Sequence, residues 1–362
     1  MKYLIISNDP AMLYRYRAEV IKELLLENTV VVCVPDGDIA PFVDMGCEVL
    51  KVNVDRRGIN PIKDLALYKK YKRIISDIKP DAVLTYSIKP NIYGGYASRK
   101  LGVPYFAHVQ GLGSAFQRKI IKNIASFMYK VALKNARGVF FENSGNRDLF
   151  VSKKIIKDSQ AITVKGGAGV VLDAFPFTEM EDCDTVNFLF VGRIMKEKGI
   201  DELFSVARKM KDELGSKVSF TVAGGFEEEY ANTVSELTNS GVINYVGFVK
   251  DVLPLYKKCH AVVLPSYHEG LANVLIEGAS VGRALITSDI HGCKETVQDG
   301  ESGFLVPLAD ADALYCSMMA FYNMSLDEKR QMGLNGHKYV SEGFNRSDVV
   351  KFTVDTLREG LK

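Results

Sequence analysis

Short apolar segments alternate with segments of helical period along the whole chain, and this alternation restricts the possible folds more than any other feature. The apolar segments have the length of buried strands, and the stretches between them, such as residues 14–27, have the length of helices. Strands that alternate with helices build a parallel sheet with helices on both faces, which predicts an α/β fold. The predicted strands are residues 3–7, 30–34, 82–86, 105–109 and 138–142, then 188–191, 219–223, 243–246, 261–264, 284–287 and 303–306.

The length of the chain predicts two such sheets. The 362 residues, 47% of them hydrophobic, exceed what a single core normally holds. Residues 169–184 contain a proline, several acids and no clear period, so we expect the boundary there. We predict two Rossmann-like domains, residues 1–172 and 173–346, that face each other across a ligand-binding cleft. The last helix, within residues 347–362, is expected to return to the first domain.

Composition excludes several classes of protein. No window approaches the roughly 20 consecutive apolar residues of a membrane-spanning helix, and the first residues resemble a strand rather than a cleaved leader. The six cysteines are scattered, without a C-x-x-C pair or partner histidines, which argues against disulfides and structural zinc. These features predict a cytosolic protein.

Two glutamates, Glu269 and Glu277, stand at a predicted strand–loop–helix junction. A buried strand precedes Glu269, and a helix over residues 274–281 contains Glu277. The free N–H groups at the start of a helix attract an anion, and the small Gly270 and Ala272 allow close approach. A phosphate bound there would leave both carboxylates free to accept hydrogen bonds from hydroxyl groups on either side. A nucleotide sugar has that arrangement, whereas an unrelated pair of glutamates would more often be a cap and a solvated side chain.

The spacing and the flanks of these glutamates closely resemble the E-x7-E signature of glycosyltransferase family 4, retaining enzymes with the GT-B fold. The resemblance implies that Glu269 orients the hydroxyl groups of the sugar and that Glu277 holds the ribose. A basic loop after the strand at 188–191 also matches the family, in which its arginine and its second lysine bind the donor diphosphate. That role carries over to Arg193 and Lys198, whose charges would stabilise the leaving group.

The remaining donor-site candidates come from the same loop. Its backbone amides would hold the diphosphate, and the histidine before Glu269 is a further candidate. These donor-binding residues are His268, Gly270, Leu271, Ala272 and Asn273.

Three segments of the N-terminal half resemble a bacterial subgroup of the family that assembles capsule, O-antigen and protein-linked glycans. They are residues 55–61, 85–94 and 110–116. The best-known members of the subgroup are N-acetylgalactosaminyltransferases, and in them these segments face an acceptor sugar on a polyprenyl diphosphate. The implied acceptor-binding residues are Arg56, Arg57, Lys89 and Asn91, with either Gln110 or His108 in place of the sugar-contacting histidine of the family.

Charge is distributed unevenly between the halves of the chain. Residues 1–180 contain 27 Lys and Arg against 17 Asp and Glu, whereas residues 181–362 contain 19 against 27. Residues 117–134 combine many of the cations with apolar residues at helical spacing, which predicts a basic amphipathic helix. Such a helix either packs on its own domain or lies on an anionic membrane. We therefore expect an enzyme at the cytoplasmic face of the inner membrane; nucleic acid is not expected, because no recognition motif is present.

The expected reaction is retaining transfer from a UDP-sugar, N-acetylgalactosamine by resemblance, to a lipid-linked sugar. It needs no cofactor and no metal if the cations carry the charge, and the three Asp-x-Asp patterns at 36–38, 182–184 and 310–312 are interpreted as chance. A UDP-sugar epimerase of the same fold is the alternative. A dinucleotide-dependent oxidoreductase is a second alternative, but the sequence has no G-x-G-x-x-G motif after a predicted strand. A non-catalytic binding protein is the third alternative. The sequence leaves the oligomeric state open.

Overall fold

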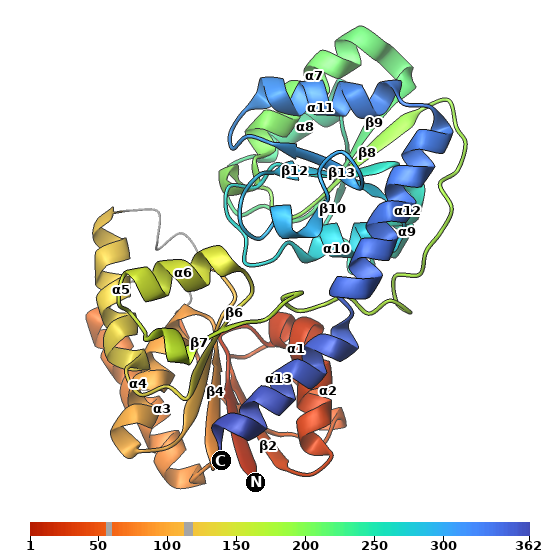
Figure 1. The fold of residues 1–362 in the computed structure, drawn as a ribbon. Coiled ribbons are helices and arrows are strands. Elements are labelled where there is room, and N and C mark those ends of the chain that lie inside the picture. The colour runs from red at the N-terminus through yellow and green to blue at the C-terminus, as the bar shows by residue number, and fades with distance from the viewer. Residues whose placement is uncertain (56–59, 112–118) are drawn as a thin grey trace. The chain divides into compact units, whose positions relative to one another are not determined.

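In the computed structural model the chain forms two α/β units (Figure 1). The residues that the structure describes are 1–55, 60–111 and 119–362, without the side chains of residues 119 and 120. The first unit combines Met1–Ala168 with Ser347–Lys362, and the second is Gly169–Arg346. The first boundary thus lies at residue 168, where the sequence analysis placed it at 172.

The first unit is built on a seven-stranded sheet in which all neighbours are parallel, in the order β3-β2-β1-β4-β5-β6-β7. The five strands predicted for this half are confirmed. The sequence analysis missed β3, which has charged residues at both ends, and β7, which has three residues. The strands are β1 (Lys2–Ile6), β2 (Thr29–Val34), β3 (Glu48–Lys51), β4 (Ala82–Tyr86), β5 (Tyr105–Val109), β6 (Gly138–Phe141) and β7 (Ala161–Thr163).

Helices cover both faces of this sheet (Figure 1). On one face lie α1 (Pro10–Leu25), α2 (Ala40–Asp44) and α13 (Arg346–Gly360), which includes the predicted returning helix. On the other face lie α3 (Pro61–Ile78), a π-helical turn (Pro90–Gly94), α4 (Gly95–Leu101), α5 (Lys119–Leu133) and α6 (Ser144–Ser152). Two of the helices begin at an Asx-Pro pair. Asp9 and Asn60 accept backbone N–H groups of the first turn, and the following proline has no N–H to satisfy.

Helix α5 is the predicted basic amphipathic helix, but it buries a different face from the one that its apolar spacing suggested. Ala125 and Tyr129 lie in the core of the first unit, with Leu133 one turn further on. Ile124 and Phe127, which belong to the predicted apolar stripe, are 52% and 67% exposed. The apolar stripe of α5 therefore reaches the surface instead of packing wholly on its own unit.

The second unit repeats the architecture with a six-stranded parallel sheet, in the order β10-β9-β8-β11-β12-β13. All six predicted strands are confirmed. They are β8 (Val186–Val191), β9 (Val218–Ala223), β10 (Asn244–Gly247), β11 (Ala261–Leu264), β12 (Ala284–Ser288) and β13 (Gly303–Val306). The helices are α7 (Ile200–Leu214), α8 (Ala231–Asn239), α9 (Leu253–Lys258), α10 (Asn273–Ser280), α11 (Ala311–Asn323) and α12 (Leu326–Gly343).

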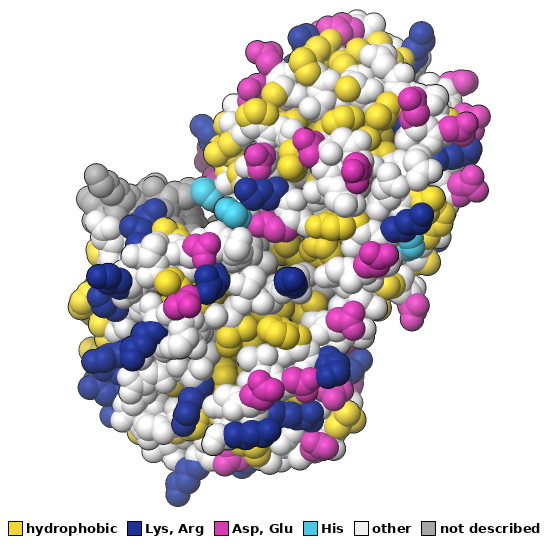
Figure 2. Space-filling model, viewed as in Figure 1, with side chains coloured by type: hydrophobic (Ala, Val, Ile, Leu, Met, Phe, Trp, Pro, Cys, Tyr) yellow, Lys and Arg dark blue, Asp and Glu magenta, His cyan; other side chains and the backbone are white. Residues whose placement is uncertain are grey.

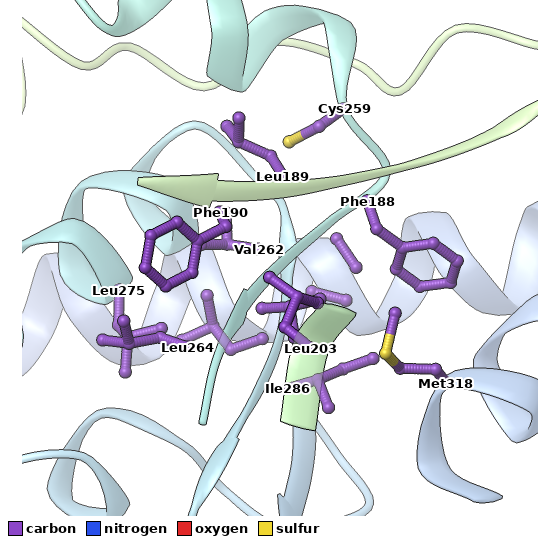
Figure 3. Packing of buried hydrophobic residues seen from close by; sticks show 14 of the residues in the cluster. Phe188, Leu189, Phe190, Leu203, Cys259, Val262, Leu264, Leu275, Ile286 and Met318 are labelled. Carbon is purple, nitrogen blue, oxygen red and sulfur yellow. The ribbon is translucent and has the colours of Figure 1, made fainter. Parts of the chain in front are cut away.

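The central strands of the second unit are buried on both faces, as expected of a parallel sheet between two helix layers. Figure 3 shows Phe188 and Phe190 on one side of β8 and Leu189 on the other, beside Cys259. Four of the six cysteines of the chain are buried, two in each unit. Within the described residues, no helix is both long and apolar enough to cross a membrane.

Helix α12 packs against α10 and the turn that follows it, and a glycine makes this close approach possible. A Cβ atom at Gly333 would lie 2.1 Å from the carbonyl oxygen of Gly282, far inside van der Waals contact. At Gly336, one turn further along the same helix, the nearest atoms would be 3.6 Å away. The two glycines therefore share a helix but differ in the room around them.

We expect Gly333→Ala to destabilise the second unit relative to Gly336→Ala. Alanine raises helix propensity at both positions by about 1 kcal/mol, but only at 333 must the backbone of the neighbouring turn move, at a cost of about 1–3 kcal/mol. Urea unfolding followed by circular dichroism measures the difference between the matched variants. Equal midpoints for the two would contradict the packing described.

Candidate active site

The strand order of the second unit reverses between β8 and β11, and this switch point is where ligands bind in open parallel sheets. The segments that follow these two strands carry Lys198 and Glu269. The Lys198 Nζ atom lies 2.5 Å from Oε1 of Glu269. Both side chains are largely buried, at 15% and 12% exposure. The predicted catalytic residues are Glu269, Arg193 and Lys198, and the structure brings the first and the last of them together.

A glycine explains how the lysine reaches the glutamate. Gly199 has a φ of 68°, and a Cβ atom there would lie 1.9 Å from the carbonyl oxygen of Pro265. The single turn of residues 196–198 therefore rests directly on the end of β11. Two hydrogen bonds to the carbonyl oxygen of Glu197 fix this contact, because it accepts the Tyr267 N–H at 2.8 Å and the Ser266 hydroxyl at 3.2 Å.

The start of α10 offers backbone donors next to Glu269. The N–H groups of Leu271, Asn273 and Val274 donate to no other residue in the part of the chain that the structure describes. The N–H of Ala272 is different, because it donates to the carbonyl oxygen of Gly292 at 2.8 Å. The Ala272 N–H thus already has a partner within the second unit, and the predicted contact of this residue with the donor stays a prediction. Free N–H groups at the positive end of a helix can hold an anion.

The loop after β12 packs against the segment that leads into α10. Gly292 has a φ of 94°, and a Cβ atom there would lie 2.7 Å from the carbonyl oxygen of Gly270. Only glycine fits this position. The side chains of Leu271 and Ala272 are buried at 5% and 3% exposure, so these residues face a ligand through their backbones only.

Glu277 lies on α10, two turns beyond Glu269, and is 4% exposed. Its Oε2 accepts a hydrogen bond from the Tyr256 hydroxyl at 3.0 Å. The adjacent Gly278 is required by packing, because a Cβ atom there would lie 2.6 Å from Cγ2 of Val262 on β11. Glu277 is thus a fixed carboxylate near the switch point, oriented by a tyrosine that the sequence analysis did not identify.

Arg193 and His268 are both exposed. Arg193 is 56% exposed, and its Nη1 is 3.6 Å from Oε2 of Glu227, an acid that the sequence analysis missed. His268 is exposed. The turn carrying Arg193 depends on Gly224, where a Cβ atom would lie 1.7 Å from the carbonyl oxygen of Gly192. A glycine pair directly after β9 was the sequence signal for this close contact.

The residues predicted to bind the acceptor are described only in part. Arg56 and Arg57 lie outside the described residues. Lys89 forms an ion pair with Asp64 on α3, with Nζ 2.7 Å from Oδ1, and the two side chains are 12% and 11% exposed. Burial, with the charge of Asp64 and a hydrogen bond to it, raises the pKa of the neighbouring Tyr93. Lys89 is thus paired with an acid of its own unit, as Lys198 is, and its predicted role in acceptor binding stays a prediction.

Asn91 and His108 are buried within the first unit, and their predicted contact with the acceptor stays a prediction. Asn91 is fully buried, and its Nδ2 donates to the carbonyl oxygen of His108 at 2.8 Å. The ring of His108, 2% exposed, stacks between Tyr86 and Phe140, with centroids 4.8 and 4.6 Å away. Burial, with a smaller effect of a nearby arginine, lowers the pKa of His108 well below its usual value. Gln110 at the end of β5 is half-buried and is the one of the two alternatives that reaches the surface.

Metal binding stays untested. Among the residues that are described, no three His, Cys, Asp or Glu side chains come together as a metal site would require. The predicted absence of a metal requirement remains a prediction about the reaction.

The buried imidazole of His108 predicts a pH dependence of stability. The folded state keeps the ring neutral, whereas in the unfolded chain it binds a proton below a pH of about 6.5. The free energy of unfolding should therefore fall as the pH falls below that value, by about 1.4 kcal/mol per pH unit from this group. We expect His108→Phe to remove this contribution. Urea unfolding of wild type and variant between neutral and mildly acidic pH measures it, and identical slopes would contradict it.

Comparison with known proteins adds to this geometry. The family model "Glycosyl transferase 4-like" matches residues 11–143, and "Glycosyl transferases group 1" matches residues 176–339. The two matches fall in the first and the second unit, respectively.

Two curated relatives match over most of their length. The chain is 27% identical over 333 residues to an N,N'-diacetylbacillosaminyl-diphospho-undecaprenol alpha-1,3-N-acetylgalactosaminyltransferase of Campylobacter jejuni, with 87% of each chain covered. It is 25% identical over 343 residues to a UDP-Gal:alpha-D-GlcNAc-diphosphoundecaprenol alpha-1,3-galactosyltransferase of Escherichia coli, with 88% of this chain and 87% of the relative covered.

Solved structures share the fold. Anabaena HepE in complex with UDP-glucose superposes with a TM-score of 0.81 at 16% identity, over 99% of this chain and all of that one. A glycosyltransferase from Rickettsia africae gives a TM-score of 0.76 at 19% identity, over 100% of this chain and 99% of that one. The fold is GT-B, as the sequence resemblance implied.

Proposed function

We propose, from the premise that this chain is a glycosyltransferase of the group 1, 4-like type, that it transfers a sugar from a UDP-sugar to a lipid-linked acceptor. The acceptor is a sugar carried on a polyprenyl diphosphate, and the product enters a bacterial surface or protein glycan. The observation that carries the donor half of the proposal is the Lys198–Glu269 pair beside free amides at the switch point of the second unit.

The names of the relatives support the choice of substrates. Both relatives described above act on acceptors linked to undecaprenol through a diphosphate, and the Escherichia coli enzyme uses a UDP-sugar. The sugar transferred by the Campylobacter jejuni relative is N-acetylgalactosamine. We therefore take UDP-N-acetylgalactosamine as the first donor to test.

In this proposal a diphosphate replaces Glu269 as the partner of Lys198. The Lys198 ammonium group and the N–H groups of Leu271, Asn273 and Val274 would then surround the anionic phosphates. Glu269, released from the lysine, would accept hydrogen bonds from hydroxyl groups of the sugar. Glu277 would accept hydrogen bonds from the ribose, with Tyr256 holding its other side. Each residue thereby takes the part of the donor that matches its charge.

The transfer step is proposed to retain the anomeric configuration. The acceptor hydroxyl oxygen forms a bond to the anomeric carbon on the face from which the diphosphate leaves, and the bond from that carbon to the phosphate oxygen breaks. The departing oxygen takes the hydroxyl proton, so the step needs no protein nucleophile. Lys198, the amides and Arg193 at the rim would stabilise the negative charge that develops on the diphosphate.

We also place the enzyme at the cytoplasmic face of the inner membrane. A polyprenyl-linked acceptor is confined to a bilayer, so the enzyme must approach it there. The exposed apolar residues Ile124 and Phe127 lie on a helix that is rich in lysine, which is the composition of a membrane-surface helix. Contact with anionic lipid would bring the first unit to its substrate.

Transfer itself tests the proposal. The purified protein should convert a polyprenyl-diphosphate-linked N-acetylhexosamine to a disaccharide when supplied with UDP-N-acetylgalactosamine, and nuclear magnetic resonance should show an alpha linkage. A reaction that retains its rate in EDTA fits a metal-free mechanism, whereas rescue of a lost rate by manganese or magnesium would overturn that part. Conversion of the donor without acceptor would instead indicate an epimerase.

Two lysines of one turn provide a matched test of the leaving-group role. Lys198→Ala removes the buried cation and should lower kcat by about 100- to 1000-fold, the usual effect of deleting one preorganised donor. Lys196→Ala removes an exposed cation two residues away and should leave kcat near that of wild type. Steady-state kinetics with radiolabelled donor measures both. Equal losses, or none in either variant, would remove Lys198 from the site.

A further inference from the structure

A second cationic site lies in the first unit, away from the edge where ligands of parallel sheets bind. It is a pocket of about 780 Å3 between the C-terminal ends of α4 and α5 and residues 151–160, which connect α6 to β7. Each of these segments leads directly into the start of a strand, namely β5, β6 or β7. The pocket therefore adjoins the amino ends of the strands, whereas Lys89 and Gln110 follow their carboxyl ends.

The lining of the pocket carries six Lys and Arg side chains and one acid. The acid, Asp158, is already paired with Arg147, whose Nη2 lies 2.5 Å from its Oδ1. Four of the lysines have no ion-pair partner within residues 1–55, 60–111 and 119–362. They are Lys130, Lys134, Lys154 and Lys157. Like charges gathered without a counter-charge repel one another, so the pocket is suited to an anion from outside the chain.

The pocket has a rigid floor. Gln160 donates from Nε2 to the carbonyl oxygens of Leu133 and Ala136, at 3.0 and 2.8 Å, and its Oε1 accepts the N–H of Lys157. This amide ties the end of α5 to the segment before β7. Lys154 has a φ of 53°, a left-handed conformation that a lysine rarely adopts and that such a fixed frame can maintain.

An exposed apolar side chain stands at the rim of the pocket, which favours a lipid over a soluble anion. Phe127 lines the pocket and is 67% exposed, and Ile124, one turn earlier on α5, is 52% exposed. On α5, Phe127, Lys130 and Val131 follow one another at helical spacing, and Lys134 comes directly after the last residue of the helix, so apolar and cationic side chains share one face. Figure 2 shows Lys and Arg side chains with apolar ones between them on the side of the first unit where α5 and α6 lie.

We propose that this pocket binds the phosphate headgroup of an anionic phospholipid, while Phe127 and Ile124 enter the apolar layer of the bilayer. This inference deepens the membrane contact of the proposed function and names its partner, but it does not depend on glycosyl transfer. The lysines supply charge for a phosphate, and the rim supplies apolar surface that a free phosphate or a nucleic acid would leave in water.

Vesicle flotation tests the proposal with the full chain. Wild type should float with vesicles of phosphatidylglycerol and phosphatidylcholine and should not float with phosphatidylcholine alone. The double variant Lys130→Gln/Lys134→Gln should bind the anionic vesicles about 30-fold more weakly, since each cation near the surface contributes about 1 kcal/mol. The variant Lys217→Gln/Lys250→Gln removes the same charge from exposed positions of the second unit and should bind like wild type.

Phe127→Ser separates a lipid from another polyanion. It removes no charge, so weakened flotation would show that the apolar rim enters the bilayer. Undiminished flotation of this variant, together with displacement of the protein by an RNA homopolymer, would overturn the lipid assignment. Equal flotation of both lysine double variants would overturn the pocket.

Failure of this inference is distinguishable from failure of the proposed function. Transfer to a short-chain, water-soluble acceptor in detergent should proceed at the wild-type rate in the pocket variants, because none of the substituted residues belongs to the candidate active site. Loss of that activity in a variant with an unchanged circular dichroism spectrum would place the pocket in the acceptor site and overturn a separate lipid role.

Discussion

The close approach of Gly199 to the carbonyl oxygen of Pro265 is the constraint on which the donor site depends. It seats the turn after β8 on the end of β11 and so places Lys198 against Glu269. Neither charge could be buried at this depth alone, because an unpaired ion in a protein interior is strongly destabilising. The pair is therefore a structural contact. When it separates, it also offers one cation and one hydrogen-bond acceptor to a ligand with complementary groups.

Much of the fold could be predicted from the sequence because parallel strands between helix layers are continuous apolar runs. Strands such as β11 and β13 were predicted to the residue for this reason. β3 and β7 escaped because their signal is weak: the first has charged ends, and the second is three residues long. The buried face of α5 escaped for another reason, since an apolar stripe does not reveal whether its partner is the protein or something outside it.

The residues of the candidate site also differ in how far local sequence pattern could place them. Lys198 and Glu269 lie in segments that follow strands and Glu277 lies within α10, so local pattern was sufficient to predict which elements carry them. Lys89 depends on Asp64, which is 25 positions away on α3, and no spacing indicates that pairing. His108 lies on β5 and Asn91 lies in the π-helical turn beside the sheet. Only the packing of the fold decides that both side chains are buried. Polar residues near a strand end are thus the hardest to assign to a ligand or to the interior.

The position of α13 has a consequence for how the chain assembles on the ribosome. The face of the first sheet that packs on α13 takes Val349, Val354 and Leu357 into its core. These residues are synthesised after the whole of the second unit, Gly169–Arg346. Domains ordinarily mature in order from the N-terminus. Here the second unit can complete its fold first, and the part of the first sheet that α13 covers stays exposed until that helix has been synthesised.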